Sequence, residues 1–179
     1  MREHFERKYL PQFVYGGIDG AITTLAVMAG AFGASLSSSI ILILGFANLA
    51  ADGFSMGVSS YLSSKSQKDL HRKHKDAARH TTEANQALKY GIATFLSFIV
   101  IGFIPLFPFV LGIFSRSIYL YQFQLSVIFT GVALIIVGGV KGLIVKKSLW
   151  RSGLETLIIG GIAAALAFLV GFFLRGLII

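Results

Sequence analysis

Residues 39–62 read SIILILGFANLAADGFSMGVSSYL, a long apolar run that contains a single charged side chain, Asp52. A helix that crosses about 30 Å of lipid hydrocarbon needs about 20 mostly apolar residues. Within lipid, a single segment can satisfy its own backbone hydrogen bonds only as a helix. The stretch therefore predicts a membrane-spanning helix.

Four further stretches of this kind predict an all-α membrane protein with five transmembrane helices, formed as a single domain over residues 1–179. Residues 35–38 separate the first two spans, which predicts a tight helical hairpin. Pro105 and Pro108 predict a kink near the outer end of the third span. The other predicted spans are residues 13–34, 90–113, 123–145 and 154–178.

The composition of the chain agrees with a protein embedded in lipid. Hydrophobic residues make up 55% of it and charged residues 13%, and the mean hydropathy is +0.76. A soluble domain carries about 25% charged residues. These values exclude an ordinary soluble enzyme, a disordered protein and a fibrous repeat. The absence of Cys excludes disulfides and thiolate chemistry, and no catalytic grouping stands out, so an enzyme is not expected.

The positive charges indicate how the chain is oriented. All of the 16 Lys and Arg residues except Arg116 and Arg175 fall on one side of the predicted spans. Because such an excess marks the cytosolic side, we expect a cytosolic N-terminus and a C-terminus outside. This bias also accounts for the net charge of +8, so the expected partner is membrane lipid and not nucleic acid.

Two carboxylates, Asp19 and Asp52, lie inside predicted spans, where a charged side chain costs about 2.5–3.5 kcal/mol. Four-residue spacing places Asn48 and Met56 on the same stripe as Asp52, and it places Thr23 one turn after Asp19. Because the first two spans run antiparallel, we expect the two stripes to converge on one polar path.

Carboxylates, an amide and a thioether together suit a divalent transition metal such as Fe²⁺, because the thioether adds affinity for softer metals. Two other interpretations stay open. Asp19 and Asp52 would also serve as a hydrogen-bonded pair that joins two helices, and Met56 would also serve as simple packing.

Three segments of the chain resemble the vacuolar iron transporter family. The segment DGAITTLAVMAG, residues 19–30, is similar to the family's first-helix signature. The segment GFANLAADGFSMG, residues 45–57, with YLS at residues 61–63, resembles its second-helix signature. The segment GLETLIIGG, residues 153–161, resembles the start of its fifth helix.

This resemblance implies a homodimer that exports Fe²⁺, and often Mn²⁺, from the cytosol in exchange for protons, with no tightly bound cofactor. The metal would follow a path at the dimer interface, lined by the first two spans. The family's pathway Asp and Met match Asp19 and Met56. Asn48 stands where iron-transporting members have a membrane Glu, and Ser60 stands where many members have an acid.

In the leading hypothesis, Asp19 binds metal and takes up a proton when the metal leaves. Met56 discriminates against the hard ions Mg²⁺ and Ca²⁺, and Asp52 lines the path or holds its helix in register. The expected membrane is the plasma membrane of a bacterium or archaeon, or the vacuolar membrane in a eukaryote. A passive cation or small-solute channel and a membrane assembly protein without transport both stay open.

The cytosolic segment at residues 63–89 is shorter than in iron-storing members of the family. Read as one helix, it places four weaker candidate metal ligands on one face, following i, i+7, i+11, i+14 spacing. The alternative is a solvated helix whose cations contact anionic lipid headgroups. The four residues are Asp69, Asp76, His80 and Glu83.

Glu155 lies at the start of the fifth predicted span, four residues after Arg151. A helix N-terminus stabilises a carboxylate, and Arg151 is placed to pair with it. We expect Glu155 to anchor the helix, with a cytosolic proton-exchange site as the alternative.

Overall fold

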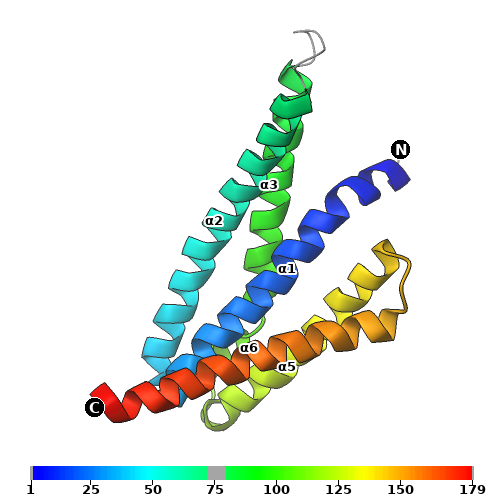
Figure 1. Cartoon of the computed structure of the whole chain (residues 1–179). Helices are drawn as coiled ribbons and strands as arrows, with labels where there is room; N and C mark the ends of the chain where they lie inside the picture. The colour runs from blue at the N-terminus through cyan, green and yellow to red at the C-terminus, as the bar shows by residue number, and fades with distance from the viewer. Residues whose placement is uncertain (1, 72–79, 179) are drawn as a thin grey trace.

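The computed structural model describes the backbone of residues 2–71 and 80–178, and the side chains of residues 9–67 and 85–177. Within these residues the structure is all-helical. Figure 1 shows long helices crossing at different angles. The helices are α1 (Arg2–Gly33), α2 (Ser38–His71), α3 (His80–Gly102), α4 (Phe107–Phe114), α5 (Arg116–Ile144) and α6 (Leu149–Ile178).

Four of these helices are each long and apolar enough to cross a membrane, and the count is five when α3 and α4 are taken as one bent span. The expectation of five spans therefore holds with a broken third span. The outward surface agrees with lipid contact, because large apolar side chains such as Trp150, Phe173 and Leu177 are exposed.

The break between α3 and α4 occurs where the prolines predicted a kink. Asn85–Gly102 and Phe107–Phe114 are inclined by 47° to each other. Pro105 and Pro108 supply no backbone N–H, so the α-helical ladder cannot continue through them. Ser126 on α5 donates a hydrogen bond of 2.7 Å to the carbonyl oxygen of Pro105, which satisfies one acceptor at the break.

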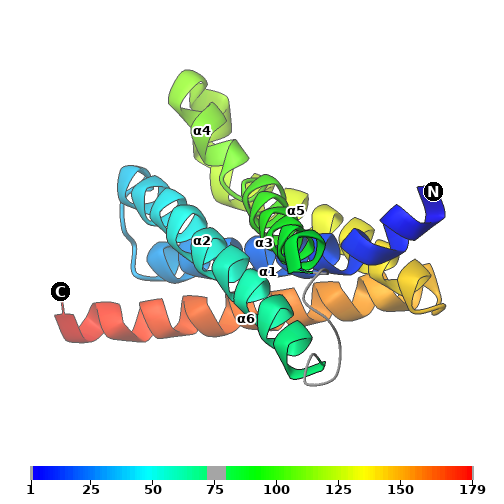
Figure 2. The same cartoon turned by 90° about the horizontal axis from the view of Figure 1, so that it is seen from above.

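Helix α1 lies at the centre of the fold and contacts α2, α3, α5 and α6 (Figures 1 and 2). Glycines bring its backbone against its neighbours. A Cβ on Gly20 would lie 2.5 Å from the carbonyl oxygen of Phe98 in α3, and a Cβ on Gly171 of α6 would overlap the carbonyl oxygen of Gly30. Only glycine permits such close approach.

The largest buried side chains form one cluster shared by α1, α2, α3 and α4. Met28, Ile41, Phe98 and Phe109 are each at most 1% exposed. The core thus holds the α1–α2 hairpin against the broken third span, and it fixes the position of the polar stripes on α1 and α2.

Three contacts hold the turn between α1 and α2. Ser35 has a left-handed backbone with φ 57°, and its hydroxyl accepts a hydrogen bond from Arg175 near the end of α6. Ser38, the first residue of α2, accepts another from Gln122 of α5. Phe32 stacks on the ring of Phe123 with centroids 4.0 Å apart. The predicted tight hairpin is therefore present, and α5 and α6 brace it.

The interpretation of residues 63–89 as one helix with a single ligand face is wrong. Helices α2 and α3 run antiparallel and side by side (Figure 1), so Asp69 and Glu83 belong to different helices. The side chains of Asp69, Asp76, His80 and Glu83 lie outside the described residues, and their role as weaker metal ligands stays a prediction.

Candidate metal pathway between α1 and α2

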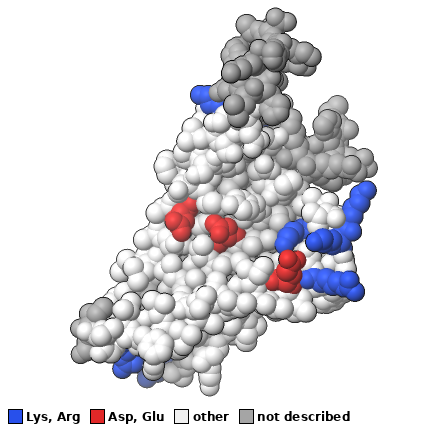
Figure 3. Space-filling model, viewed as in Figure 1, with Lys and Arg blue, Asp and Glu red and all other residues white. Residues whose placement is uncertain are grey.

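Asp19 on α1 and Asp52 on α2 face each other closely enough for their charges to interact. Both side chains are partly buried. Neither has an ion-pair partner among the residues that the structure describes. Figure 3 shows red carboxylate atoms in the middle of this face with no blue atoms beside them. The two carboxylates therefore lie near each other within one chain, and the convergence of both stripes on one polar path stays a prediction.

The other polar residues of the two stripes are tied to α1. Asn48 donates a hydrogen bond of 3.5 Å from its amide nitrogen to the hydroxyl of Thr24, and its side-chain oxygen has no hydrogen-bond partner among the described residues. Thr23 donates to the backbone carbonyl of Asp19 at 2.9 Å. Thr23 thus satisfies its own helix, and its oxygen keeps acceptor capacity.

Met56 lies one turn from Asp52, and its side chain lies between the buried cluster and a cleft. Part of its side chain packs against the buried cluster, as the packing interpretation expected. It also lines a cleft of about 430 Å³ between α1 and α2, together with Tyr15 and Ser60. The thioether is therefore placed between the apolar core and a polar opening.

The cleft contains residues that sequence reasoning missed. Gln12 enters it from α1, and Ser59, Ser63 and Ser64 enter it from α2. The spacing of the serine pairs 59/60 and 63/64 by four residues was the available signal, because it continues the stripe of Met56 toward the helix end. Single serines in membrane helices are common, and this pattern alone indicates little.

The described residues hold no cluster of three or more His, Cys, Asp or Glu side chains. The site in one chain therefore consists of two carboxylates, one amide oxygen and one thioether. With one oxygen from each carboxylate, this set supplies four donors, fewer than the six that an octahedral divalent ion takes.

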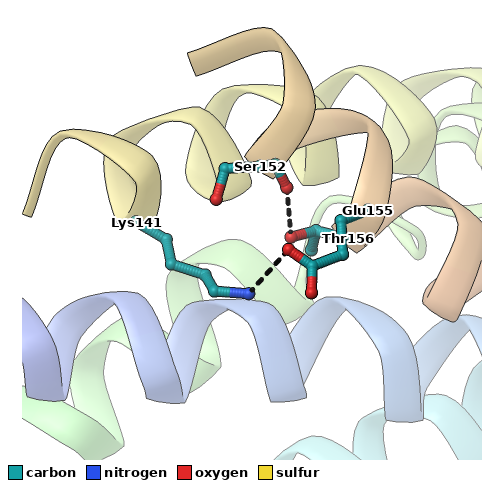
Figure 4. A network of polar contacts seen from close by, with 4 residues as sticks. All are labelled: Lys141, Ser152, Glu155 and Thr156. Atoms are coloured by element: carbon teal, nitrogen blue, oxygen red, sulfur yellow. Dashed lines mark hydrogen bonds and ion pairs between the residues drawn. The ribbon is translucent and has the colours of Figure 1, made fainter. Parts of the chain in front are cut away.

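Glu155 pairs with a partner other than the one expected. Its carboxylate lies 3.6 Å from the ammonium of Lys141 on α5, and Figure 4 shows this pair beside the hydrogen bond from Thr156 to the carbonyl oxygen of Ser152. The expected pairing with Arg151 is absent from the described contacts. The ion pair joins the end of α5 to the start of α6.

Glu155→Gln should leave metal flux and its dependence on pH within about twofold of wild type, and it should cost at most about 1 kcal/mol of stability. The reason is that a half-exposed ion pair contributes about 0–1 kcal/mol. Initial rates in proteoliposomes across a pH series, with unfolding in one detergent, would check this. A shifted pH profile would instead assign Glu155 to proton exchange.

Comparison of the sequence with known proteins identifies a family. The family model described as the VIT family matches residues 10–88 and 73–172. A vacuolar iron transporter of Plasmodium berghei (strain Anka) is 27% identical, over 95% of this chain and 84% of that protein. Vacuolar iron transporter 1 of Arabidopsis thaliana is also 27% identical, over 87% of this chain and 82% of its own length.

A shorter stretch is more alike, since a vacuolar iron transporter of Toxoplasma gondii is 45% identical over 62 residues. The alignment with the Plasmodium berghei protein runs over 228 positions, more than the 179 residues of this chain, so that relative carries additional residues within the matched region. The two family matches overlap at residues 73–88. This overlap lies in the segment that was expected to be shorter than in iron-storing members. The chain belongs to the VIT family.

Proposed function

We propose that this protein is a secondary transporter that exports divalent transition metal from the cytosol in exchange for protons, with Fe²⁺ as the main substrate and Mn²⁺ as a second one. The observation that carries the proposal is that Asp19 and Asp52, on two neighbouring apolar helices, interact with each other and have no ion-pair partner among the described residues. Met56 lies one turn from Asp52 and packs against the buried cluster. Relatives over most of the chain are named vacuolar iron transporters.

The coupling follows from the cost of charge in a membrane. Two neighbouring carboxylates without cations repel each other and are poorly solvated. A divalent ion neutralises both, and protons do so when the ion is absent. Metal and protons therefore compete for the same oxygens of Asp19 and Asp52, and this competition is the chemical requirement for exchange.

Selectivity is assigned to Met56. A thioether gives little to Mg²⁺ or Ca²⁺, which prefer hard oxygen ligands, and more to Fe²⁺. This assignment is supported by the position of Met56 in the lining of the cleft, one turn from Asp52. Thr23, Asn48 and Ser60 are assigned to the walls of the same path.

We also propose that two copies form the working unit. With one oxygen from each carboxylate, one chain offers four donors to an octahedral ion, and a second copy would supply the rest. The exposed face of α2 beside Asp52 carries the small side chains Ala47, Ala51 and Ser55, which permit close approach of another helix. Covering this face would also remove the two carboxylates from lipid.

A passive cation channel on the same scaffold is the second candidate. It is favoured by Asn48, a neutral amide beside the two carboxylates, because fewer titratable groups weaken proton coupling. Under this reading, Asp19 and Asp52 attract cations without exchanging protons.

The test is uptake of Fe²⁺ and Mn²⁺ into proteoliposomes, with and without an interior more acidic than the exterior. Antiport predicts that the acidic interior accelerates uptake and that metal entry alkalinises the interior, with protein-free vesicles and Mg²⁺ as controls. Uptake whose rate does not depend on the pH gradient would establish the passive channel instead. Absence of flux for every ion would leave the two aspartates as contacts between helices in an assembly protein.

A further inference from the structure

The described side chains that line the cleft between α1 and α2 are all neutral, and most of them are polar. Its walls carry the hydroxyls of Ser59, Ser63 and Ser64, the amide of Gln12 and the phenol of Tyr15, with Met56 on the same wall. Among residues 9–67 and 85–177, whose side chains are described, no Asp, Glu, Lys, Arg or His lines it. The opening thus differs in chemistry from the carboxylate pair one turn beyond Met56.

Several of these groups are free to bind something. The side-chain oxygen of Gln12 is buried and has no hydrogen-bond partner in the described part of the chain. Ser59 and Ser63 are exposed and make no hydrogen bond with described residues. Ser60, in contrast, is tied to Thr94 of α3 at 3.1 Å, which fixes one wall. A buried acceptor without a partner is costly unless a donor enters the cleft.

A divalent ion that has lost its water does not suit this cleft and supplies no hydrogen-bond donor. Removing its water requires anionic ligands in compensation, and the walls offer none within the part of the chain that the structure describes. An ion that keeps its water instead presents outward O–H groups, which need neutral acceptors such as hydroxyl and amide oxygens. Six waters at about 30 Å³ each occupy about 180 Å³, and the cleft holds about 430 Å³.

The order of groups along α2 supports the same assignment. Positions three or four apart are separated by about 4.5–6 Å along a helix axis, so an ion would pass Ser63, Ser59, Met56 and Asp52 in turn. Asp19 and Asp52 lie one turn beyond Tyr15 and Met56 along their helices, and their charges would attract a cation through the cleft, since low-dielectric walls focus such fields. The neutral walls supply the contacts.

The geometry points to a binding site for a fully hydrated divalent cation in the cleft between α1 and α2, held through its water by Gln12, Ser59 and Ser63. This inference rests on the proposed function and adds a step to it. The ion is captured with its water shell intact and loses water only at Met56, Asp19 and Asp52. Capture is then indifferent to the identity of the metal, and selection belongs to the second step.

The probe is hexaamminecobalt(III), whose ligands do not exchange and whose N–H groups imitate the water shell of a hydrated ion. Titration of the detergent-solubilised full chain, followed by cobalt NMR or calorimetry, measures binding without any flux. Gln12→Leu and Ser63→Ala should each weaken binding about fivefold, the effect of one lost hydrogen bond of about 1 kcal/mol. Ser66→Ala, an exposed serine of α2 outside the cleft, is the matched control.

The outcomes separate the two proposals. Binding that depends on Gln12 and Ser63 in a protein without metal flux would support the hydrated-ion site and overturn transport. Metal flux without probe binding, or binding that Ser66→Ala weakens as much as Ser63→Ala, would overturn the site and leave transport standing. If the transport proposal and the hydrated-ion site are both correct, the probe should block Fe²⁺ uptake from the cytosolic side without entering the vesicles.

Discussion

Asp19→Asn should lower the initial rate of Fe²⁺ uptake by about 100-fold or more. The amide keeps the shape of the side chain and removes its charge, so the ion loses one anionic ligand in a low-dielectric setting. Breaking a buried charge pair costs about 3–5 kcal/mol, and each 1.36 kcal/mol corresponds to a tenfold change in rate. The measurement is uptake into proteoliposomes at matched protein incorporation.

Glu155→Gln makes the same acid-to-amide change away from the proposed path and serves as the matched control. Equal loss of flux in both variants would show that Asp19 has no special place in transport. Asp52→Asn completes the series. A loss close to that of Asp19→Asn would place Asp52 in the path, whereas intact flux with reduced stability would assign Asp52 to helix register.

Gly171→Ala should destabilise the folded protein by at least about 3 kcal/mol. The new Cβ would overlap the carbonyl oxygen of Gly30, so the backbones of α1 and α6 must separate. Overpacking of a well-packed interior usually costs about 1–3 kcal/mol, and here the obstacle is backbone, which cannot rotate away. Unfolding by a denaturing detergent, followed by circular dichroism, measures the change.

Gly161→Ala lies in the same helix, and a Cβ there meets no atom within 4 Å. It should leave stability unchanged or raise it by up to about 1 kcal/mol, because Ala is the better helix former. Equal stability of Gly171→Ala and Gly161→Ala would contradict the close backbone contact between α1 and α6.

Much of this fold follows from hydropathy and proline alone. Four of the five predicted spans match single observed helices to within one residue beyond an end, the span at 90–113 covers α3 and α4, and the break falls at Pro105. The ends differ more: α5 begins at Arg116, seven residues before its predicted span at 123–145. Hydropathy finds the part of a helix that lies in hydrocarbon, and a helix can continue into the interface through residues such as Tyr119 and Gln122.

The site was predictable where charge made it conspicuous. Asp19 and Asp52 stand out because a carboxylate in lipid is costly, and the antiparallel hairpin was enough to bring them together. Gln12 was missed because neutral polar residues near helix ends are ordinary. The partner of Glu155 was missed because Lys141 reaches it from another helix, and spacing along one helix cannot show such a contact.

The backbone contacts of α1 bear on how the protein moves. Glycines fasten α1 to α3 near Asp19 and to α6 near Gly30, and a Cβ on Gly91 of α3 would lie 2.6 Å from the carbonyl oxygen of Gly57 in α2. Helices joined this closely cannot slide or rotate separately without losing contact. The carboxylates of Asp19 and Asp52 are therefore held in fixed positions relative to each other by a rigid set of helices. In the proposed dimer, exposing these two carboxylates first to one side of the membrane and then to the other would therefore require whole chains to tilt.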